Sequence, residues 1–365
     1  MVLSLRFRRP AFLFAVLVTV SSCSTPAPSF ESTLSIHFVD VEQGSCILIV
    51  SPSGVAALID AGTGRSGNSP SDADPVDLIS TLEREDPSFD LRYVIASHYD
   101  ADHIGKLDEV LQAGLLSAGG VIYDRGDPQA ESDTVDEAAF KAYKSAASAK
   151  MRRSLGPWSA PLDLGAGVTL RCYAADGVVL CREETQAVAL PVSEENDRSI
   201  AMVLEFKDIR IWLGGDLGER IERALAPYAP DVDVYVVHHH GSKESSSSLL
   251  LSALRPEFAI CQSGETNTYG HPNAEAVRRI LGTSTTSGGH STFIQQNRGN
   301  PTDARSDDAL AYAIADPDGV GGAPGTISIS TDGHSLTVTW PSGSVGLLGA
   351  AAVASTLPEL PPVRP

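Results

Sequence analysis

A strand-like run that leads directly into metal-binding residue types is the feature that most constrains the fold. The apolar residues 93–96 (YVIA) are followed at once by residues 97–103 (SHYDADH). Within six residues this stretch holds two imidazoles and two carboxylates, those of His98, Asp100, Asp102 and His103. An apolar β-type run predicts a buried strand, and a helical pattern follows it. We therefore expect a polar cluster at the C-terminal end of a strand, with a solvated polar loop as the simpler alternative.

The rest of the chain alternates β-type and helical patterns, as expected of an α/β domain. β-type runs occur at 34–39, 46–50, 55–59, 200–206, 209–213, 232–237, 258–261, 326–330 and 335–340. Helical patterns occur at 75–84, 104–111, 217–225, 248–254 and 274–281. The chain has 365 residues, of which 42% are hydrophobic, enough for one large core over residues 34–345.

Two segments are expected to lie outside that core. Residues 129–155 are rich in Ala, Lys and Glu and predict an exposed helical insertion. Residues 346–365 are first Ala-rich and then Pro-rich, which predicts a disordered tail.

The N-terminal residues have the order of a secretory signal. Three arginines (Arg6, Arg8 and Arg9) precede an apolar run at 11–20, which is too short to span a bilayer. The junction at 20–23 (VSSC) resembles a bacterial lipobox. We expect a lipoprotein signal at 1–22, a lipid-modified Cys23 and a Pro/Ser-rich tether at 23–33. The alternative is ordinary signal cleavage with Cys23 incidental.

The other cysteines are consistent with an exported protein. Asp176-Gly177 is a strong two-residue hairpin turn, and in that register Cys172 lies opposite Cys181. A non-hydrogen-bonded pair of this kind lies within disulfide range, so we predict a Cys172–Cys181 disulfide. Two reduced cysteines are the alternative, and Cys46 and Cys261 are expected to be buried thiols.

Two more groups of polar side chains follow predicted strands. Residues 212–216 (WLGGD) place Asp216 at the end of one strand, where an N-cap role is the alternative. Residues 236–243 (VVHHHGSK) place three histidines, Ser242 and Lys243 after the next strand. His271 precedes a helix, and a capping or core role is as good a reading for it as metal binding.

The net charge restricts the class of ligand. The chain carries 27 basic and 46 acidic residues, a formal charge of −19. An acidic surface repels phosphate backbones, so a long duplex is a poor ligand. A phosphate-bearing substrate would have to be drawn in locally, for example by metal ions.

Together, these motifs resemble the metallo-β-lactamase fold superfamily, and more narrowly the hydrolase domain of ComEC-type competence proteins. Besides the three groups above, residues 38–45 (FVDVEQGS), 58–62 (LIDAG) and 196–200 (NDRSI) carry the resemblance, which covers about residues 34–281. It implies a four-layer αβ/βα sandwich with two divalent metal ions at the edge between its sheets.

The resemblance also implies a ligand set. His98 and Asp100 would hold one ion, Asp102 and His103 the other, and Asp216 would bridge them. The last ligand is open among His240, His239 and His271. Relatives usually carry His where Asp100 stands, and a carboxylate there favours manganese against zinc. No His occurs between 104 and 237, so Asn196 is a candidate for the place of a superfamily histidine.

Such a centre implies hydrolysis by metal-bound hydroxide, with a phosphodiester as the expected substrate. The predicted catalytic residues are Asp102, His239, His240, Ser242 and Lys243, the last four as phosphate contacts or proton donors to the leaving group. The expected substrate is a small phosphoester, a nucleotide or a short nucleic acid. No protein partner is inferred, and the only membrane contact is through Cys23, which places the protein at the periplasmic or cell-surface face. A lactonase or β-lactam hydrolase and a non-catalytic metal-binding lipoprotein are the alternatives.

Overall fold

The computed structural model describes residues 33–62, 74–128, 135–181, 186–264, 267–297, 313–316, 325–341, 343–348 and 351–353. The predicted signal and nearly all of the tether lie outside these ranges and stay a prediction. Within the described ranges, no helix is both long and apolar enough to cross a bilayer.

The first of two sheets has the strand order β20-β19-β18-β17-β1-β2-β3-β4-β5-β6. Its strands are β1 Leu34–Phe38, β2 Ile47–Val50, β3 Val55–Ile59, β4 Asp90–Ile95, β5 Val121–Asp124, β6 Met151–Ser154, β17 Ile327–Thr331, β18 Ser335–Trp340, β19 Gly343–Leu348 and β20 Ala351–Val353. Neighbours are antiparallel from β20 to β3 and parallel from β3 to β6. The parallel part brings the carboxyl ends of β3, β4 and β5 to one edge.

The second sheet has the order β10-β9-β8-β11-β12-β13-β14-β15-β16, with β7 paired to β8. Its strands are β7 Leu162–Asp163, β8 Val168–Ala175, β9 Val178–Cys181, β10 Gln186–Ala189, β11 Ala201–Phe206, β12 Ile209–Leu213, β13 Val234–Val236, β14 Phe258–Cys261, β15 Thr292–Asn297 and β16 Ala313–Asp316. From β12 to β16 the neighbours are parallel. β13 and β14 are buried on both faces, as expected of their continuous apolar sequences.

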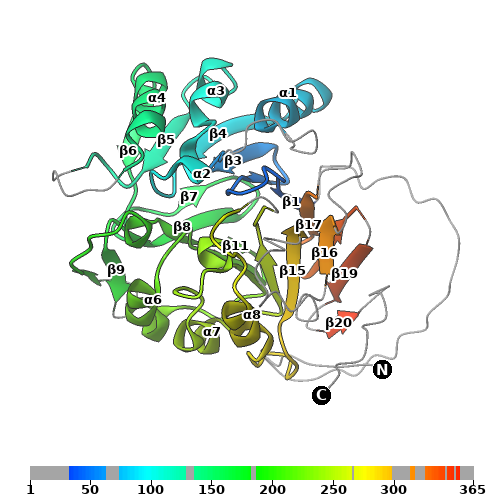
Figure 1. Ribbon diagram of the computed structural model, residues 1–365. Helices are drawn as coiled ribbons and strands as arrows, with labels where there is room; N and C mark the ends of the chain where they lie inside the picture. Colours follow the sequence, from blue (N-terminus) through cyan, green and yellow to red (C-terminus); the bar gives the residue numbers. More distant parts are fainter. Residues whose placement is uncertain are drawn as a thin grey trace, which may run out of the picture.

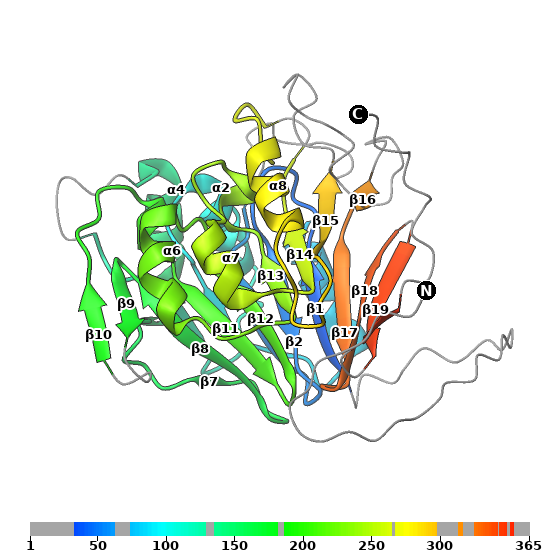
Figure 2. The ribbon, with the colours of Figure 1, turned by 90° about the horizontal axis from the view of Figure 1, so that it is seen from below.

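Helices cover the outer face of each sheet, so the molecule has four layers (Figure 1). The helices over the first sheet are α1 Pro75–Glu85, α2 Ala101–Ile104, α3 Leu107–Gln112 and α4 Glu137–Ala147, and those over the second are α6 Glu219–Leu225, α7 Ser248–Leu254 and α8 Ala274–Leu281. Figure 2 shows α6, α7 and α8 side by side on the second sheet. Three short 3-10 turns complete the described elements: η2 Asn196–Arg198, η3 Ala226–Tyr228 and η4 His238–Gly241.

Three apolar clusters hold these layers together. One lies between the sheets and includes Leu34, Ile36 and Phe38, which alternate along β1 with more exposed residues. The other two lie between each sheet and its helices. The predicted four-layer αβ/βα architecture is therefore confirmed.

The predicted helical insertion at 129–155 is wrong in part. The helix is α4, which buries Tyr143 completely and is a member of the helix layer. The Tyr143 hydroxyl donates to Asp124 at 2.6 Å. Residues 151–154 are not helical but form the edge strand β6, parallel to β5. Helix propensity does not detect such a strand, because pairing with β5 decides its conformation.

The predicted disordered tail is also wrong where the structure describes it. Residues 343–348 and 351–353 form β19 and β20, which extend the first sheet beyond β18. The remaining residues of 346–365 lie outside the described ranges.

The predicted Cys172–Cys181 disulfide is not formed, and both residues are buried free thiols, as are Cys46 and Cys261. The hairpin has the expected register, but β8 and β9 pair only at Ala174–Val179 and Ala175–Val178. The register with β11 then shifts between Ala201 and Met202, and such a bulge bends its strand. The Cys172 thiol lies in the core between the sheets, against the Ala174 carbonyl at 3.3 Å.

Peptide mapping under denaturing, non-reducing conditions is expected to find Cys172 and Cys181 both alkylated. In the native protein alkylation should be slow, because burial raises the pKa of the Cys172 thiol and removes it from the reagent. Burial also raises the pKa of Cys261 to about 12, so Cys261 is a matched internal control for slow native alkylation. A disulfide-linked peptide that contains both Cys172 and Cys181 would contradict the structure.

Candidate metal centre

The sequence motifs that follow β4, β12 and β13 meet at one edge of the sandwich. Residues 97–103 follow β4 of the first sheet, Asp216 follows β12, and η4 follows β13 of the second sheet. The carboxyl ends of parallel strands in an open sheet are where ligands usually bind. Here both sheets contribute to the same edge.

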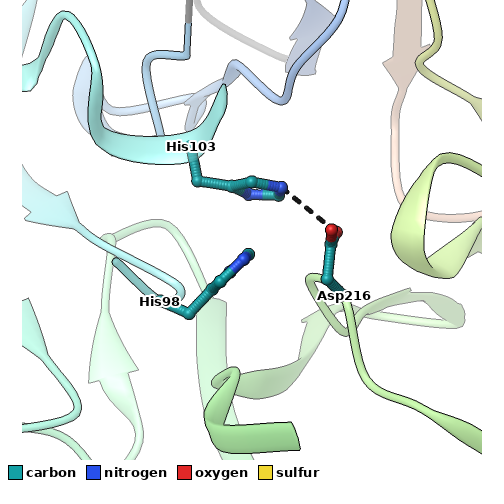
Figure 3. Close-up of side chains that lie close together, drawn as sticks. All are labelled: His98, His103 and Asp216. Carbon is teal, nitrogen blue, oxygen red and sulfur yellow. Dashed lines mark ion pairs between the residues drawn. The ribbon is translucent and has the colours of Figure 1, made fainter. Parts of the chain in front are cut away.

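The first group of possible ligands consists of His98, His103 and Asp216 (Figure 3). One ligand atom of each lies within 4.8 Å of the others. His103 Nε2 lies 3.1 Å from Asp216 Oδ1. The Nε2 atom of His98 is fully buried and has no hydrogen-bond partner. Because an unpartnered buried nitrogen is costly, this atom fits a ligand that binds between the three side chains.

The second group shares His103 with the first and adds Asp102 and His240. His240 Nε2 lies 3.3 Å from Asp102 Oδ2 and 3.2 Å from His103 Nε2. The other oxygen of Asp216 lies 3.6 Å from His240 Nε2, so the two groups are continuous. The four residues predicted to converge, His98, Asp102, His103 and Asp216, are therefore gathered in one centre.

Contacts behind the imidazoles fix which nitrogen faces the centre. Asp60, directly after β3, lies 2.7 Å from His103 Nδ1 and also accepts from the Ser97 hydroxyl at 2.7 Å. His240 Nδ1 donates to the backbone carbonyl of Gln262 at 2.8 Å. Such contacts hold the tautomer and the ring orientation of metal-binding histidines. Asp60 can be recognised in the sequence from its position at the end of a predicted strand. A contact through the backbone, such as that of Gln262, leaves no signal in the sequence.

The loop that carries Asp102 and His103 is also held through its backbone. The Ser45 amide donates to the Asp102 carbonyl at 2.9 Å, and the Ala61 amide donates to the His103 carbonyl at 2.8 Å. Gly62 approaches so closely that a Cβ there would lie 1.8 Å from the Asp102 carbonyl oxygen. The sequence segments 38–45 and 58–62 thus serve to position the ligand loop.

The backbone of η4 turns His239 and His240 toward the centre. Both residues have a positive φ, 51° and 53°, followed by Gly241 at 83°. Non-glycine residues in this region cost about 1–3 kcal/mol each and occur mainly at functional sites. His239 Nε2 lies 3.8 Å from Asp216 Oδ2 and accepts from the Asn196 side-chain amide nitrogen at 3.3 Å.

Charge compensation dominates the electrostatics of the centre. Burial lowers the pKa of His103, but the carboxylates of Asp216 and Asp60 outweigh it and hold that pKa well above its ordinary value. Burial raises the pKa of Asp216, but the charges of His103 and His240 hold it well below its usual range. Burial also raises the pKa of Asp102, but the hydrogen bond from His240 outweighs burial and holds that pKa below its ordinary value. Both carboxylates are thus ionised, that of Asp216 buried and that of Asp102 partly exposed, an arrangement that a divalent cation would satisfy.

Some predicted site residues lie at the margin of the centre or away from it. Asp100 is partly exposed, with an oxygen 3.6 Å from His98 Nε2. His271 belongs to neither ligand group; its ring lies 5.4 Å from that of His239, and burial lowers its pKa to about 3. The Ser242 hydroxyl accepts from the Glu244 amide at 3.3 Å.

Lys243 and His238 lie away from the centre. Lys243 lines a separate groove on the helix layer with Arg223 and Arg279. His238 is a core residue, since its Nδ1 lies 2.7 Å from Glu222 and its Nε2 accepts from the Trp212 indole at 2.9 Å. The run of histidines in the sequence thus divides between the centre and the core.

The donor set fits divalent metal ions. Three imidazoles and three carboxylates converge: those of His98, His103, His240, Asp100, Asp102 and Asp216. This mixture of nitrogen and oxygen ligands is one that zinc and manganese accept. A cavity of about 20 Å³ beneath the centre, lined by Asp60, Ser97 and Gln262 among others, is large enough for a water molecule.

Comparison with known proteins finds similarity to a curated protein and to solved structures. Recombination protein 2 of Haemophilus influenzae is 27% identical over 251 residues, which are 68% of this chain and 27% of that protein. The chain thus spans only about a quarter of that relative's length. Among solved structures, the metallo-β-lactamase fold protein YhfI from Bacillus subtilis has a TM-score of 0.41 at 14% identity, covering 72% of this chain and 95% of that one. Zn²⁺-bound PqqB from Methylobacterium extorquens has a TM-score of 0.31 at 15% identity, covering 55% and 61%.

A family model extends the similarity over most of the domain. The model described as the metallo-beta-lactamase superfamily matches residues 39–263, a range that includes both ligand groups and parts of both sheets. The chain therefore belongs to the metallo-β-lactamase superfamily.

Proposed function

We propose that this protein is a metal-dependent hydrolase of phosphodiesters. The observation that carries the proposal is the convergence of His98, His103, His240, Asp102 and Asp216 from three separate segments of the chain into one centre. Divalent ions bound there would supply an ionised water at neutral pH and a Lewis acid for the phosphoryl oxygens. The chain's own residues supply the geometry and the proton transfers.

The side chains divide into three roles. His98 and Asp100 would hold one ion, Asp102, His103 and His240 the other, and Asp216, whose two oxygens face His103 and His240, would serve both. His239 is the polar group best placed to contact the substrate, because its ring is partly exposed and lies beside Asp216. We assign to His239 the hydrogen bond to the leaving oxygen. Ser242 and Lys243 have no place in this assignment.

Two observations favour a phosphodiester over a carbon ester. Three carboxylates make the centre oxygen-rich, which suits manganese and the hard oxygens of a phosphate. The relative from Haemophilus influenzae is named Recombination protein 2, and recombination acts on nucleic acids, which are phosphodiesters. With a net charge of −19 the surface disfavours a long duplex, so we propose a short or single-stranded nucleic acid, a nucleotide or another small phosphoester as substrate.

The proposed location is outside the cytoplasm. We propose that residues 1–22 direct export and that lipid on Cys23 holds the domain at the membrane surface. This would confine the hydrolase to substrates on the periplasmic or cell-surface side.

Purified protein loaded with Mn²⁺ or Zn²⁺ is expected to hydrolyse bis-p-nitrophenyl phosphate but not nitrocefin or a simple lactone. His98→Asn should lose this activity, because it removes the buried nitrogen that faces the centre. His37→Asn is the matched control, since His37 lies on β1 and contacts Ser328 at 3.0 Å, away from both ligand groups.

Each alternative gives a different result in these assays. Turnover of nitrocefin or the lactone in place of the phosphodiester would identify a carbon-ester or amide hydrolase. Stoichiometric metal without turnover of any of the three would identify a binding protein. An equal loss in His98→Asn and His37→Asn would mean that the activity does not arise at this centre.

A further inference from the structure

A buried ion pair that the proposed chemistry does not use lies directly behind the first ligand group. Arg125 follows β5 and Glu195 precedes η2, and they are only 5% and 3% exposed. Arg125 Nε donates to Glu195 Oε1 at 2.8 Å, and Arg125 Nη2 donates to Oε2 at 2.6 Å. This paired geometry is the strongest form of an arginine–carboxylate contact.

The pair is connected to the ligand loop through Tyr99. The Tyr99 amide, which lies between His98 and Asp100 in the chain, donates to Glu195 Oε1 at 2.9 Å. The guanidinium of Arg125 lies 4.5 Å above the centre of the Tyr99 ring. The Tyr99 hydroxyl donates to the Gly126 carbonyl at 2.6 Å. Glu195 therefore fixes the backbone between His98 and Asp100, and Arg125 and Gly126 fix the side chain of Tyr99.

The same segment connects the ligand loop to Asp216. Five residues after Glu195, the Ile200 amide donates to the Ser97 carbonyl at 2.9 Å. The Ser199 hydroxyl accepts from the Asp216 amide at 3.0 Å. His98 follows β4 of the first sheet, and Asp216 follows β12 of the second. Because residues 195–200 contact both segments, they set the distance between ligands that come from different sheets.

Stability alone does not account for this arrangement. Two charges are removed from water, and a buried ion pair is often no more stabilising than apolar side chains of similar size. What apolar side chains cannot provide is an acceptor for the Tyr99 amide. The Asp102–His103 part of the loop has separate supports in Asp60, Ser45 and Ala61.

We propose that Arg125 and Glu195 form a positioning pair for His98 and Asp100. The pair sets the affinity for the ion held by His98, Asp100 and Asp216, and leaves the ion held by Asp102, His103 and His240 almost unaffected. This inference rests on the proposed two-ion centre. Partners behind metal ligands typically change metal affinity by about 10–100-fold, which sets the expected size of the effect.

The test is a titration of the purified, metal-free chain with Zn²⁺ followed by calorimetry, and with Co²⁺ followed by visible absorption. Glu195→Gln keeps the volume but removes the charge and one of the two acceptor oxygens, so that Arg125 and the Tyr99 amide compete for the one that remains. The double variant Arg125→Met, Glu195→Leu removes both charges, so neither is left buried and unpaired, and Arg198 still neutralises Asp176 at 2.6 Å. We expect both variants to keep one tight equivalent and to bind the second about 10–100-fold more weakly.

Glu257→Gln is the matched control. Glu257 is also buried and accepts from a backbone amide, that of Ser287 at 3.0 Å. It precedes β14, whereas η4 follows the neighbouring parallel strand β13, so Glu257 lies at the opposite edge of the sheet from the centre. It should bind both equivalents as the wild type does. Urea unfolding reports whether each variant is folded. If the double variant does not fold, the titration of Glu195→Gln alone tests the positioning role.

The outcomes separate this inference from the proposed function. If the folded variants bind both equivalents as tightly as the wild type, or lose both equally, the positioning role is wrong while the centre stands. If the wild type itself binds no Zn²⁺ or Co²⁺ at these ligands, the two-ion centre fails, and the inference fails with it.

Discussion

Replacing Asp216 with alanine is expected to remove both the bound ions and the turnover. One oxygen of Asp216 lies 3.1 Å from His103, which belongs to both ligand groups, and the other lies 3.6 Å from His240 of the second group. Residues behind metal ligands are already worth about 10–100-fold in affinity or activity, so loss of a shared ligand should exceed about 100-fold. Metal content by elemental analysis and hydrolysis of bis-p-nitrophenyl phosphate measure the two losses separately.

A buried aspartate at the other end of the sheet controls for loss of stability. Asp233, just before β13, is 6% exposed and accepts from the Arg210 amide at 2.8 Å. Asp233→Ala is expected to lower the free energy of unfolding by about 1–3 kcal/mol, since it leaves a buried amide without its acceptor, yet to retain metal and turnover. Metal content and activity retained in Asp216→Ala, or lost equally in Asp233→Ala, would contradict the assignment.

Removing the metal should lower the stability of the whole domain. The centre brings the Nε2 atoms of His103 and His240 to 3.2 Å from each other, between the ionised carboxylates of Asp102 and Asp216, and a bound cation would screen these groups from one another. A ligand at 1,000 times its Kd stabilises the folded state by about 4 kcal/mol. For a domain of this size that corresponds to a rise in Tm on the order of 10 °C.

Thermal unfolding after dialysis against a chelator, and again after addition of Mn²⁺ or Zn²⁺, measures this shift. Asp216→Ala should show almost no shift with either ion, which ties the effect to the centre and excludes nonspecific binding to the acidic surface. Calcium is a useful comparison, because it prefers a larger shell of oxygen ligands alone. A shift of equal size in the wild type and in Asp216→Ala would mean that the ions act elsewhere.

The fold and most of the centre could be predicted from the sequence because both depend on local patterns. The apolar run before His98 and the alternation along β1 specify strands without reference to the rest of the chain. Since parallel strands end at a common edge, polar residues that follow several strands are brought together once the fold is known. The spacing of His98, Asp102 and His103 was therefore enough to predict both the family and the position of the site.

Other features depended on contacts that no local pattern reports. The Cys172–Cys181 register was predicted, but β8 leaves its partner after two residue pairs because of a bulge against β11. Residues 151–154 form a strand because β5 offers a free edge, and the tail contributes β19 and β20 because β18 does. Edge pairing is decided by the neighbour that a segment meets, and its own propensity is secondary.

For the proposed catalytic groups, the sequence by itself determined which residue types are present, and the tertiary structure decided which of their side chains face the centre. Residues 238–243 contain every predicted catalytic residue other than Asp102, but the left-handed backbone at His239 and His240 turns only those two rings inward. His238 is drawn into the core by Glu222 and Trp212, and Lys243 lies in a groove on the helix layer. Side-chain direction follows from backbone angles and packing partners that are distant in the chain. For the same reason the Arg125–Glu195 pair, 70 residues apart in sequence, became visible only in three dimensions.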